Sequence, residues 1–286
     1  MQVFLSQPNH LFKRIFIRFS EKIKMDIDLT GKNAIVCGST QGLGYASAVE
    51  LALLGSSVTL MARNEEKLRA ALKSLDNSKG QLHQYLVADF EDPQIVKNAI
   101  NKYISKSNQV NILINNTGGP KGGNATEATE LDFLDAFNSH LVCNHILMQA
   151  VLPSMKNSGY GRIVNIISTS VKEPIPGLAV SNTIRGAVAA WSKTLANELG
   201  KFGITVNNVL PGSMRTARYN SLLKNKATAA NNSKEEIEKN ILSEIPLNRI
   251  GTAEEFGSVV AFLCTHAASY ITGINLPVDG GKIRCF

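Results

Sequence analysis

Short apolar runs alternate with longer amphipathic segments along most of the chain. The runs are four to seven residues long and rich in Val, Ile and Leu, which is typical of buried strands. The pattern predicts strands over Ala34–Cys37, Ser57–Met61, Leu82–Val87, Val110–Ile114, Arg162–Ile167, Ile204–Leu210 and Ile274–Val278. Between them it predicts helices over Gly44–Leu54, Glu65–Leu75, Pro93–Ile104, Glu130–Met155, Ala187–Leu199 and Thr252–Cys264.

Strands that are apolar throughout, alternating with helices, indicate a parallel sheet covered on both faces. We therefore expect an α/β fold with a doubly wound parallel sheet. Ligands of such sheets lie beyond the carboxyl ends of the strands. The polar stretch Ser213–Asn248 lacks strand character and is expected to form a helical, mobile cap over the ligand. With no repeat or break in composition, residues 25–286 are expected to form one domain.

The first 24 residues differ from the rest because apolar and basic residues alternate in LFKRIFIRFSEKIK. This segment lacks the continuous apolar core of a secretory signal and is too short and charged to span a bilayer. An amphipathic helix on an anionic membrane is one interpretation. We favour a flexible extension or a wrongly assigned start, because Met25 directly precedes DIDLTGKNAIV, a natural domain start.

Charge and cysteine content narrow the function classes. Residues 1–24 carry +4 of the net charge of +7, and the remaining +3 predicts no nucleic-acid partner. A basic site for a phosphorylated cofactor is compatible with it. The four cysteines show neither paired spacing nor metal-ligand spacing, which predicts reduced thiols in a cytoplasmic protein and no metal site.

The stretch AIVCGSTQGLGYA combines a strand, a glycine turn and a helix start. Gly38, Gly42 and Gly44 allow positive φ angles and close approach of backbone N–H groups to a ligand. The helix behind the turn carries partial positive charge at its start and favours a pyrophosphate. A glycine turn without any ligand is the alternative that this loop alone leaves open.

Further motifs argue against a glycine turn without a ligand. After the predicted strands come VADFED, INNTGGP, GRIVNIIS, ITVNNVLPGSMRT and ASYITGINLPVDGG. Together with CGSTQGLG they resemble the short-chain dehydrogenase/reductase family over residues 25–281, in the branch of 3-oxoacyl-[acyl-carrier-protein] reductases. The resemblance implies a Rossmann-type fold, a nicotinamide dinucleotide, a small carbonyl or alcohol substrate and a homotetramer or homodimer.

The resemblance also implies which residues bind the dinucleotide. The glycine loop would face the pyrophosphate, the segments after the third and fourth strands would lie by the adenosine, and the segment after the sixth would approach the carboxamide. These residues are Gly38, Ser39, Thr40, Gly42, Leu43 and Gly44, then Asp89, Phe90, Asn115, Thr117 and Gly118, and finally Pro211, Gly212 and Thr216. A structural role for Asn115 and Asn116, joining neighbouring strands, is compatible with this.

The residues after the second strand bear on the choice of nucleotide. NAD sites usually place a carboxylate on the ribose hydroxyls, about 20 residues beyond the glycines. Here the strand ends in LMARN, so Ala62 stands where that acid would be. Arg63 and Ser39 could instead receive a 2′-phosphate, which favours NADP(H) over NAD(H). A solvated Arg63 that leads the next helix is the alternative.

The active-site positions depart from the family pattern. The family usually carries Asn, Ser, Tyr and Lys, and Ser168 falls at the serine position. Thirteen residues on, SNTIR places Ser181 at the tyrosine position and Arg185 at the lysine position. Counting back from Gly161 places His140 at the asparagine position. These four residues are the catalytic candidates, although His140 as a structural residue is the favoured alternative.

These replacements matter for proton transfer. Hydride reduction of a carbonyl leaves an alkoxide, which a tuned tyrosine can protonate, whereas serine is a far poorer acid. Arginine stays protonated but can hold anions or ribose hydroxyls. Two functions remain open: an NADP(H)-dependent oxidoreductase, which we favour, and a weakly active or inactive NADP(H)-binding sensor or assembly subunit.

Overall fold

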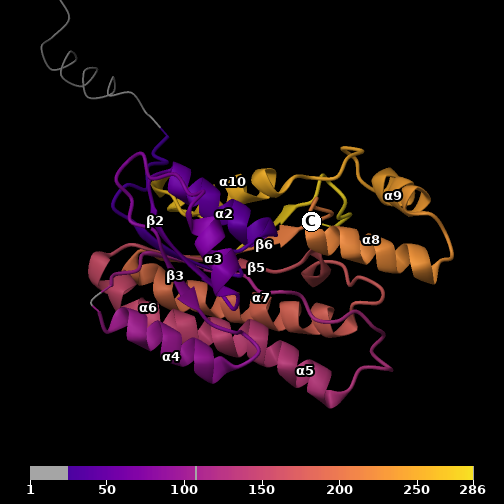
Figure 1. The fold of residues 1–286 in the computed structure, drawn as a ribbon, viewed down its shortest axis with the longest axis horizontal. Coiled ribbons are helices and arrows are strands. Elements are labelled where there is room, and N and C mark those ends of the chain that lie inside the picture. The colour runs from indigo at the N-terminus through magenta and orange to yellow at the C-terminus, as the bar shows by residue number, and fades with distance from the viewer. Residues whose placement is uncertain (1–24, 107, 286) are drawn as a thin grey trace, which may run out of the picture.

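The computed structural model describes residues 25–106 and 108–285. The predicted extension, residues 1–24, lies outside the described residues. Seven parallel strands form one sheet in the order β3-β2-β1-β4-β5-β6-β7 (Figure 1), as the apolar runs predict. The strands are β1 Asn33–Cys37, β2 Ser57–Ala62, β3 Gln84–Val87, β4 Ile112–Asn115, β5 Gly161–Ile166, β6 Ile204–Pro211 and β7 Asn275–Val278.

Helices cover both faces of the sheet (Figure 1). Helices α2 (Gly42–Leu53), α3 (Glu65–Leu72) and α10 (Ala253–Leu263) supply apolar side chains to one core with the strands. Helices α4 (Pro93–Ile104), α6 (Cys143–Ser158) and α7 (Ala179–Leu199) supply the core on the other face. The predicted α/β architecture with a doubly wound parallel sheet is therefore confirmed.

One predicted helix is divided in the structure, and another extends beyond the residues predicted to lie in it. The predicted helix Glu130–Met155 is α5 (Glu130–Phe137), a π-helical turn η1 (Asn138–Val142) and α6 in succession. Hydrophobic periodicity does not reveal such a turn, because the chain stays helical through it. Residues Ala187–Leu199 lie in helix α7, as predicted; the helix starts at Ala179, so Ser181 and Arg185 lie one turn apart on it.

The predicted cap is helical. Helices α8 (Ala217–Ala229) and α9 (Lys234–Ser243) follow β6 and lie beyond its end (Figure 1). They share a small apolar cluster with the segment before α10, in which Tyr219, Leu223 and Ile250 are buried. The cap thus has its own core, separate from the two large cores of the sheet.

A row of asparagines crosses the sheet from the end of β4 to the start of β7. Asn115, Asn165, Asn208 and Asn275 are partners in register on β4, β5, β6 and β7. The Nδ2 of Asn115 donates to the Oδ1 of Asn165 at 2.8 Å, and the Nδ2 of Asn165 donates to the Oδ1 of Asn208 at 3.0 Å. The Nδ2 of Asn208 donates to the Oδ1 of Asn275 at 2.8 Å. Such buried pairs fix the register of the strands that carry the site.

Asn165 is the central member of this row, and its replacement should destabilise the fold. Asn165→Ala leaves the amide of Asn115 and the Oδ1 of Asn208 without that buried partner, so we expect a loss of about 2–4 kcal/mol in the free energy of unfolding. Urea denaturation measures it. Asn101→Ala, on the exposed side of α4, is the matched control and should change stability little. A loss as small as that of the control would contradict a stabilising role for the row.

Candidate active site

The glycine turn between β1 and α2 is built by close packing. An added Cβ at Gly38 would lie 2.6 Å from the backbone oxygen of Asn116, and one at Gly44 would lie 2.5 Å from the oxygen of Gly38. Gly38 and Gly42 have φ angles of +56° and +61°, in the left-handed region. Glycine is therefore required at this turn for the conformation and for the contact with the end of β4.

The start of α2 lacks the side-chain cap that the cap helices α8 and α9 have. Gln41 occupies its N-cap without a side-chain capping bond, and the first turn carries no acidic residue. By contrast, the cap helices α8 and α9 begin with Thr216 and Ser233, whose side chains accept bonds from the first turn. The first backbone N–H groups of α2 thus have no capping side chain, which suits a pyrophosphate. The turn therefore fits the diphosphate of a dinucleotide.

The residues after β4 join neighbouring strands. The Nδ2 of Asn116 donates to the backbone oxygens of Cys37 and Gly38 at 3.3 and 3.1 Å. Together with the bond from Asn115 to Asn165, this is the structural role that the sequence allowed for the two asparagines. Gly118 is exposed, and an added Cβ there would meet nothing within 4 Å.

The predicted adenosine end carries one exposed cation. The Nη1 of Arg63 lies 3.0 Å from Glu91 and 3.8 Å from Asp89, and its side chain is 67% exposed. Ser39 is fully buried, and its Oγ accepts a bond from the backbone N–H of Met61. A 2′-phosphate could therefore reach Arg63 in this conformation, whereas Ser39 would first have to become exposed. Phe90 is buried, while Thr40 and Leu43 are half-buried.

The predicted carboxamide segment follows β6. Gly212 donates its N–H to the oxygen of Val278, and an added Cβ there would lie 2.6 Å from the Cα of Asp279. Thr216 caps α8, and its Cγ2 lies 3.7 Å from where a Cβ on Gly42 would be. The structure thus brings the glycine turn and this segment face to face, as a dinucleotide site requires.

The four catalytic candidates lie on three elements near the carboxyl end of β5. Ser168 follows β5 and caps the short helix η2 (Thr169–Val171), its Oγ accepting a bond from the N–H of Ser170 at 3.0 Å. That bond leaves the hydroxyl proton of Ser168 available for a substrate oxygen. Helix α7 carries Ser181 and Arg185 and packs against η1, which carries His140, and against η2.

Arg185 is the unusual member of this set. Its side chain is 8% exposed, and its Nη1 donates to the oxygen of Ile166 at 3.1 Å. Its buried Nε has no hydrogen-bond partner. Burial, with a smaller contribution from the charge of Arg218, lowers the pKa of Arg185 to about 10. The guanidinium is therefore still protonated at neutral pH.

His140 is held as a neutral base. It is 2% exposed, and its Nδ1 lies 2.5 Å from the Oγ1 of Thr117. Burial, assisted by the charge of Arg185, lowers the pKa of His140 to about 2. A residue that stays neutral across the physiological range positions its neighbours and does not donate a proton to substrate. Thr117 therefore contacts His140 in addition to its predicted place beside the ribose.

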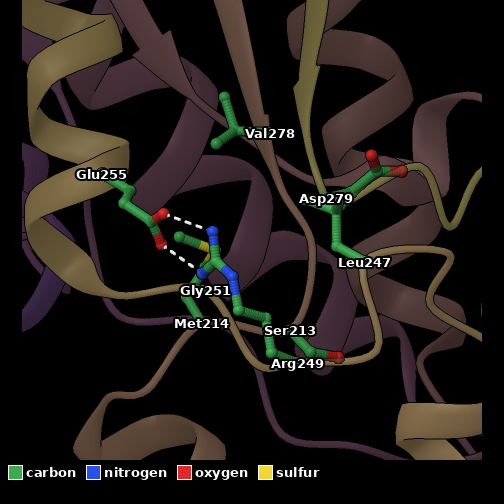
Figure 2. A pocket seen from close by; sticks show the side chains of 9 residues that line it. Ser213, Met214, Leu247, Arg249, Gly251, Glu255, Val278 and Asp279 are labelled. Atoms are coloured by element: carbon green, nitrogen blue, oxygen red, sulfur yellow. Dashed lines mark hydrogen bonds and ion pairs between the residues drawn. The ribbon is translucent and has the colours of Figure 1, made fainter.

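The cavity in Figure 2 lies where the cap joins the sheet, between the segment after β6 and the end of β7. Ser213 and Met214 line it, and an ion pair between Arg249 and Glu255 closes one side. None of the described residues that line it is a catalytic candidate. We therefore assign it to the support of the carboxamide segment.

Two residues of the cap bear on the site. The Tyr219 hydroxyl donates to Glu238 at 3.0 Å, and burial is the largest cause that raises its pKa to about 12, so Tyr219 is poorly suited to act as a proton donor. Arg218, which the sequence analysis missed, crosses from α8 to the loop after β4 and donates to the oxygen of Pro120 at 3.0 Å. Its position two residues after Thr216 gave no signal, because exposed arginines are common on helices.

The chain is similar to known proteins over most of its length. Residues 38–282 match the family model described as enoyl-(acyl carrier protein) reductase. The chain is 34% identical over 257 residues to a 3-oxoacyl-[acyl-carrier-protein] reductase of Rickettsia prowazekii, covering 90% of this chain and 99% of that protein. It is 29% identical, with the same coverage, to an NADPH-dependent reductase of Bacillus subtilis.

A solved structure is similar over nearly the whole described fold. An L-sorbose reductase of Gluconobacter frateurii, in complex with NADPH and L-sorbose, superposes with a TM-score of 0.85 at 27% identity. The match covers 92% of this chain and 100% of that one. Among the described residues, no helix is long and apolar enough to cross a membrane.

Proposed function

The chain belongs to the short-chain dehydrogenase/reductase family, and we propose that it is an NADP(H)-dependent oxidoreductase with an atypical active site. It reduces a carbonyl compound, with a 3-oxoacyl-like ketone as the first candidate, or oxidises the matching alcohol. The observation that carries the proposal is the glycine turn, which faces the carboxamide segment beside an uncapped α2. Relatives described as NADPH-dependent or solved with NADPH support the choice of NADP(H).

The proposed chemistry assigns each catalytic candidate a role. NADPH, when bound, supplies the hydride to the carbonyl carbon. The Ser168 hydroxyl donates a hydrogen bond to the carbonyl oxygen, and Arg185 holds the nicotinamide ribose or an anionic group of the substrate. Ser181 stands where the family's acid stands, but serine is too weak an acid to supply the proton alone. Water entering beside Ser181 supplies it, and the alcohol leaves neutral.

The proposal also includes a positioning role for His140 and the assembly of the chain into an oligomer. His140 stays neutral and orients Thr117 beside the ribose, so it acts as a positioning residue. Leu131, Leu134 and Phe137 form an exposed apolar face on α5, which supports a homotetramer or homodimer. Loss of a positioned acid typically lowers the rate 10²–10⁴-fold, so slow turnover is expected.

That expected slowness is also what favours the second candidate function. With Ser181 and Arg185 in place of an acid and a proton relay, the chain could bind NADP(H) as a sensor or assembly subunit with little turnover. Single-turnover mixing of bound NADPH with a panel of ketones separates the two. Ketone-dependent loss of the reduced nicotinamide absorbance supports the enzyme, and tight binding without any oxidation supports the sensor.

The nucleotide preference should depend on Arg63. Arg63→Gln removes the exposed cation proposed to bind the 2′-phosphate, so we expect about a tenfold loss of NADPH affinity and an unchanged NADH affinity. Calorimetric titration measures both. Arg69→Gln removes a charge from α3 that is paired with Glu65 and serves as the control. A parallel loss for both nucleotides, or none, would contradict the assignment.

A further inference from the structure

Arg185 is a buried cation without a counter-ion. Among the described residues it forms no ion pair, and its buried Nε has no partner. Leaving a buried charged donor unpaired costs free energy. Arg162 is the other described arginine in this state, but its guanidinium lies 4.1 Å from the centroid of the Tyr160 ring, a contact of a kind that Arg185 lacks among the described residues. The neighbouring His140 cannot be the counter-ion, because an imidazole is either neutral or positively charged. One negative group would therefore complete Arg185 as its counter-ion.

A second guanidinium faces the same region from the cap. Arg218 is exposed, reaches over the loop after β4, and its Nη2 lies 3.5 Å from where a Cβ on Gly119 would be. Among the described residues Arg218 also forms no ion pair. Its Nη2 donates a hydrogen bond to the backbone oxygen of Pro120. Its charge acts directly on Arg185, lowering the pKa of that guanidinium.

The loop under Arg218 is also tied to the start of α7. Gly123 forms a parallel bridge with Leu178, and its N–H donates to the oxygen of Gly177 at 2.8 Å. The loop after β4 and the first turn of α7 thus form one wall beside Ser181. Arg218 lies over the loop of this wall, and Arg185 lies on the helix that continues it.

We propose that Arg185 and Arg218 together bind a carboxylate of the substrate, so that the enzyme acts on oxo acids or the matching hydroxy acids. This inference rests on the proposed function and names its substrate class. Two like charges that face one region repel each other, and an anion between them converts that cost into attraction. A guanidinium matches a carboxylate by forked hydrogen bonds, and burial strengthens such a bond.

A ribose contact by Arg185 alone predicts a different result. Ribose hydroxyls are neutral, so they would satisfy donors of Arg185 without compensating its charge, and they would give Arg218 no role. The two interpretations differ in whether the charge of the substrate matters. Ketones that differ only in that charge therefore test the inference.

The test uses pyruvate, acetoacetate and levulinate, each beside its methyl ester. The three acids place the carboxylate at increasing distance from the ketone, and the esters keep the shape without the charge. Binding to the protein in complex with NADP⁺ is measured by calorimetry, and NADPH oxidation is measured in parallel. We expect at least one acid to bind about tenfold to a hundredfold more tightly than its ester.

In the variant Arg218→Gln, the preference for the acid over its ester should be about tenfold smaller, and NADPH affinity should be unchanged. Lys224→Gln removes one positive charge from the exposed side of the same helix and is the matched control. Arg185→Lys keeps the charge but loses the fork, and it should reduce the preference as well. Because Arg218 is exposed, its variant should fold even where a change at Arg185 does not.

The outcomes separate the inference from the proposed function. Acid-selective binding without any NADPH oxidation would support the carboxylate site and contradict the oxidoreductase. Oxidation of acids and esters with equal efficiency would support the oxidoreductase and overturn the carboxylate site. If the acid preference of Arg218→Gln is as large as that of Lys224→Gln, the carboxylate site is also overturned.

Discussion

Gly44→Ala should lower NADPH affinity about 100-fold and destabilise the fold by about 1–3 kcal/mol. The added Cβ would lie 2.5 Å from the oxygen of Gly38 and 2.6 Å from the Nδ2 of Asn116. The first of these atoms is backbone, and the second is held by bonds to the ends of β1, so the turn itself must move. The N–H groups that are proposed to hold the pyrophosphate would move with it.

Calorimetric titration with NADPH and urea denaturation measure the two effects separately. Gly200→Ala is the control, because an added Cβ there meets nothing within 4 Å and its φ lies in the helical region. If Gly44→Ala destabilises the fold but the folded variant binds NADPH as tightly as the parent chain, the glycine serves packing alone. The loop would then not be the diphosphate site.

The second large effect concerns His140 and acid pH. Its pKa is lowered from 6.5 to about 2 in the folded chain, chiefly by burial. Between these values the unfolded chain binds a proton that the folded chain does not, so stability falls as the pH falls below about 6.5. At pH 5 the loss from this residue should be about 2 kcal/mol relative to pH 7.

His140→Asn, which places the usual family residue there, should remove that part of the pH dependence. The measurement is the free energy of unfolding by urea at several pH values between 5 and 8 for the two chains. Loss of the contact with Thr117 lowers stability at every pH, so the slope and not the absolute value is the readout. His145→Asn, at an exposed site, should keep the parent slope. If stability depends on pH as steeply in His140→Asn as in the parent chain, His140 is not buried as a neutral base.

The fold could be predicted because its signals are local. Apolar strands, helix-length segments and the glycine turn fixed the parallel sheet, and α4 begins and ends at the predicted residues, Pro93 and Ile104. Proline at its first position and Asp92 as its cap explain that accuracy. By contrast, the sequence does not mark the exact start of α7 at Ala179, because its first turn has no side-chain cap.

Candidate site residues could be predicted from the sequence only where they belong to a sequence motif. The glycine loop and the segment after β6 carry family patterns, and the structure brings them together at Gly42 and Thr216. A strand-joining role was allowed for Asn115, but its partner Asn165, the rest of the asparagine row and Arg218 were missed because the partners are far apart in the sequence. Asn115 and Asn165 are 50 positions apart, and Arg218 and Pro120 are 98 apart. Such pairs become visible only when strand order and register are known.

The most direct measurement of the proposed activity follows the hydride itself. NADPH carrying deuterium at the transferable position of nicotinamide C4 is incubated with the protein and the ketone panel, and the products are analysed by mass spectrometry. We predict one deuterium on the carbinol carbon of a product alcohol for each NADPH oxidised. Recovery of intact labelled NADPH, tightly bound but with no labelled alcohol from any ketone, would contradict the oxidoreductase.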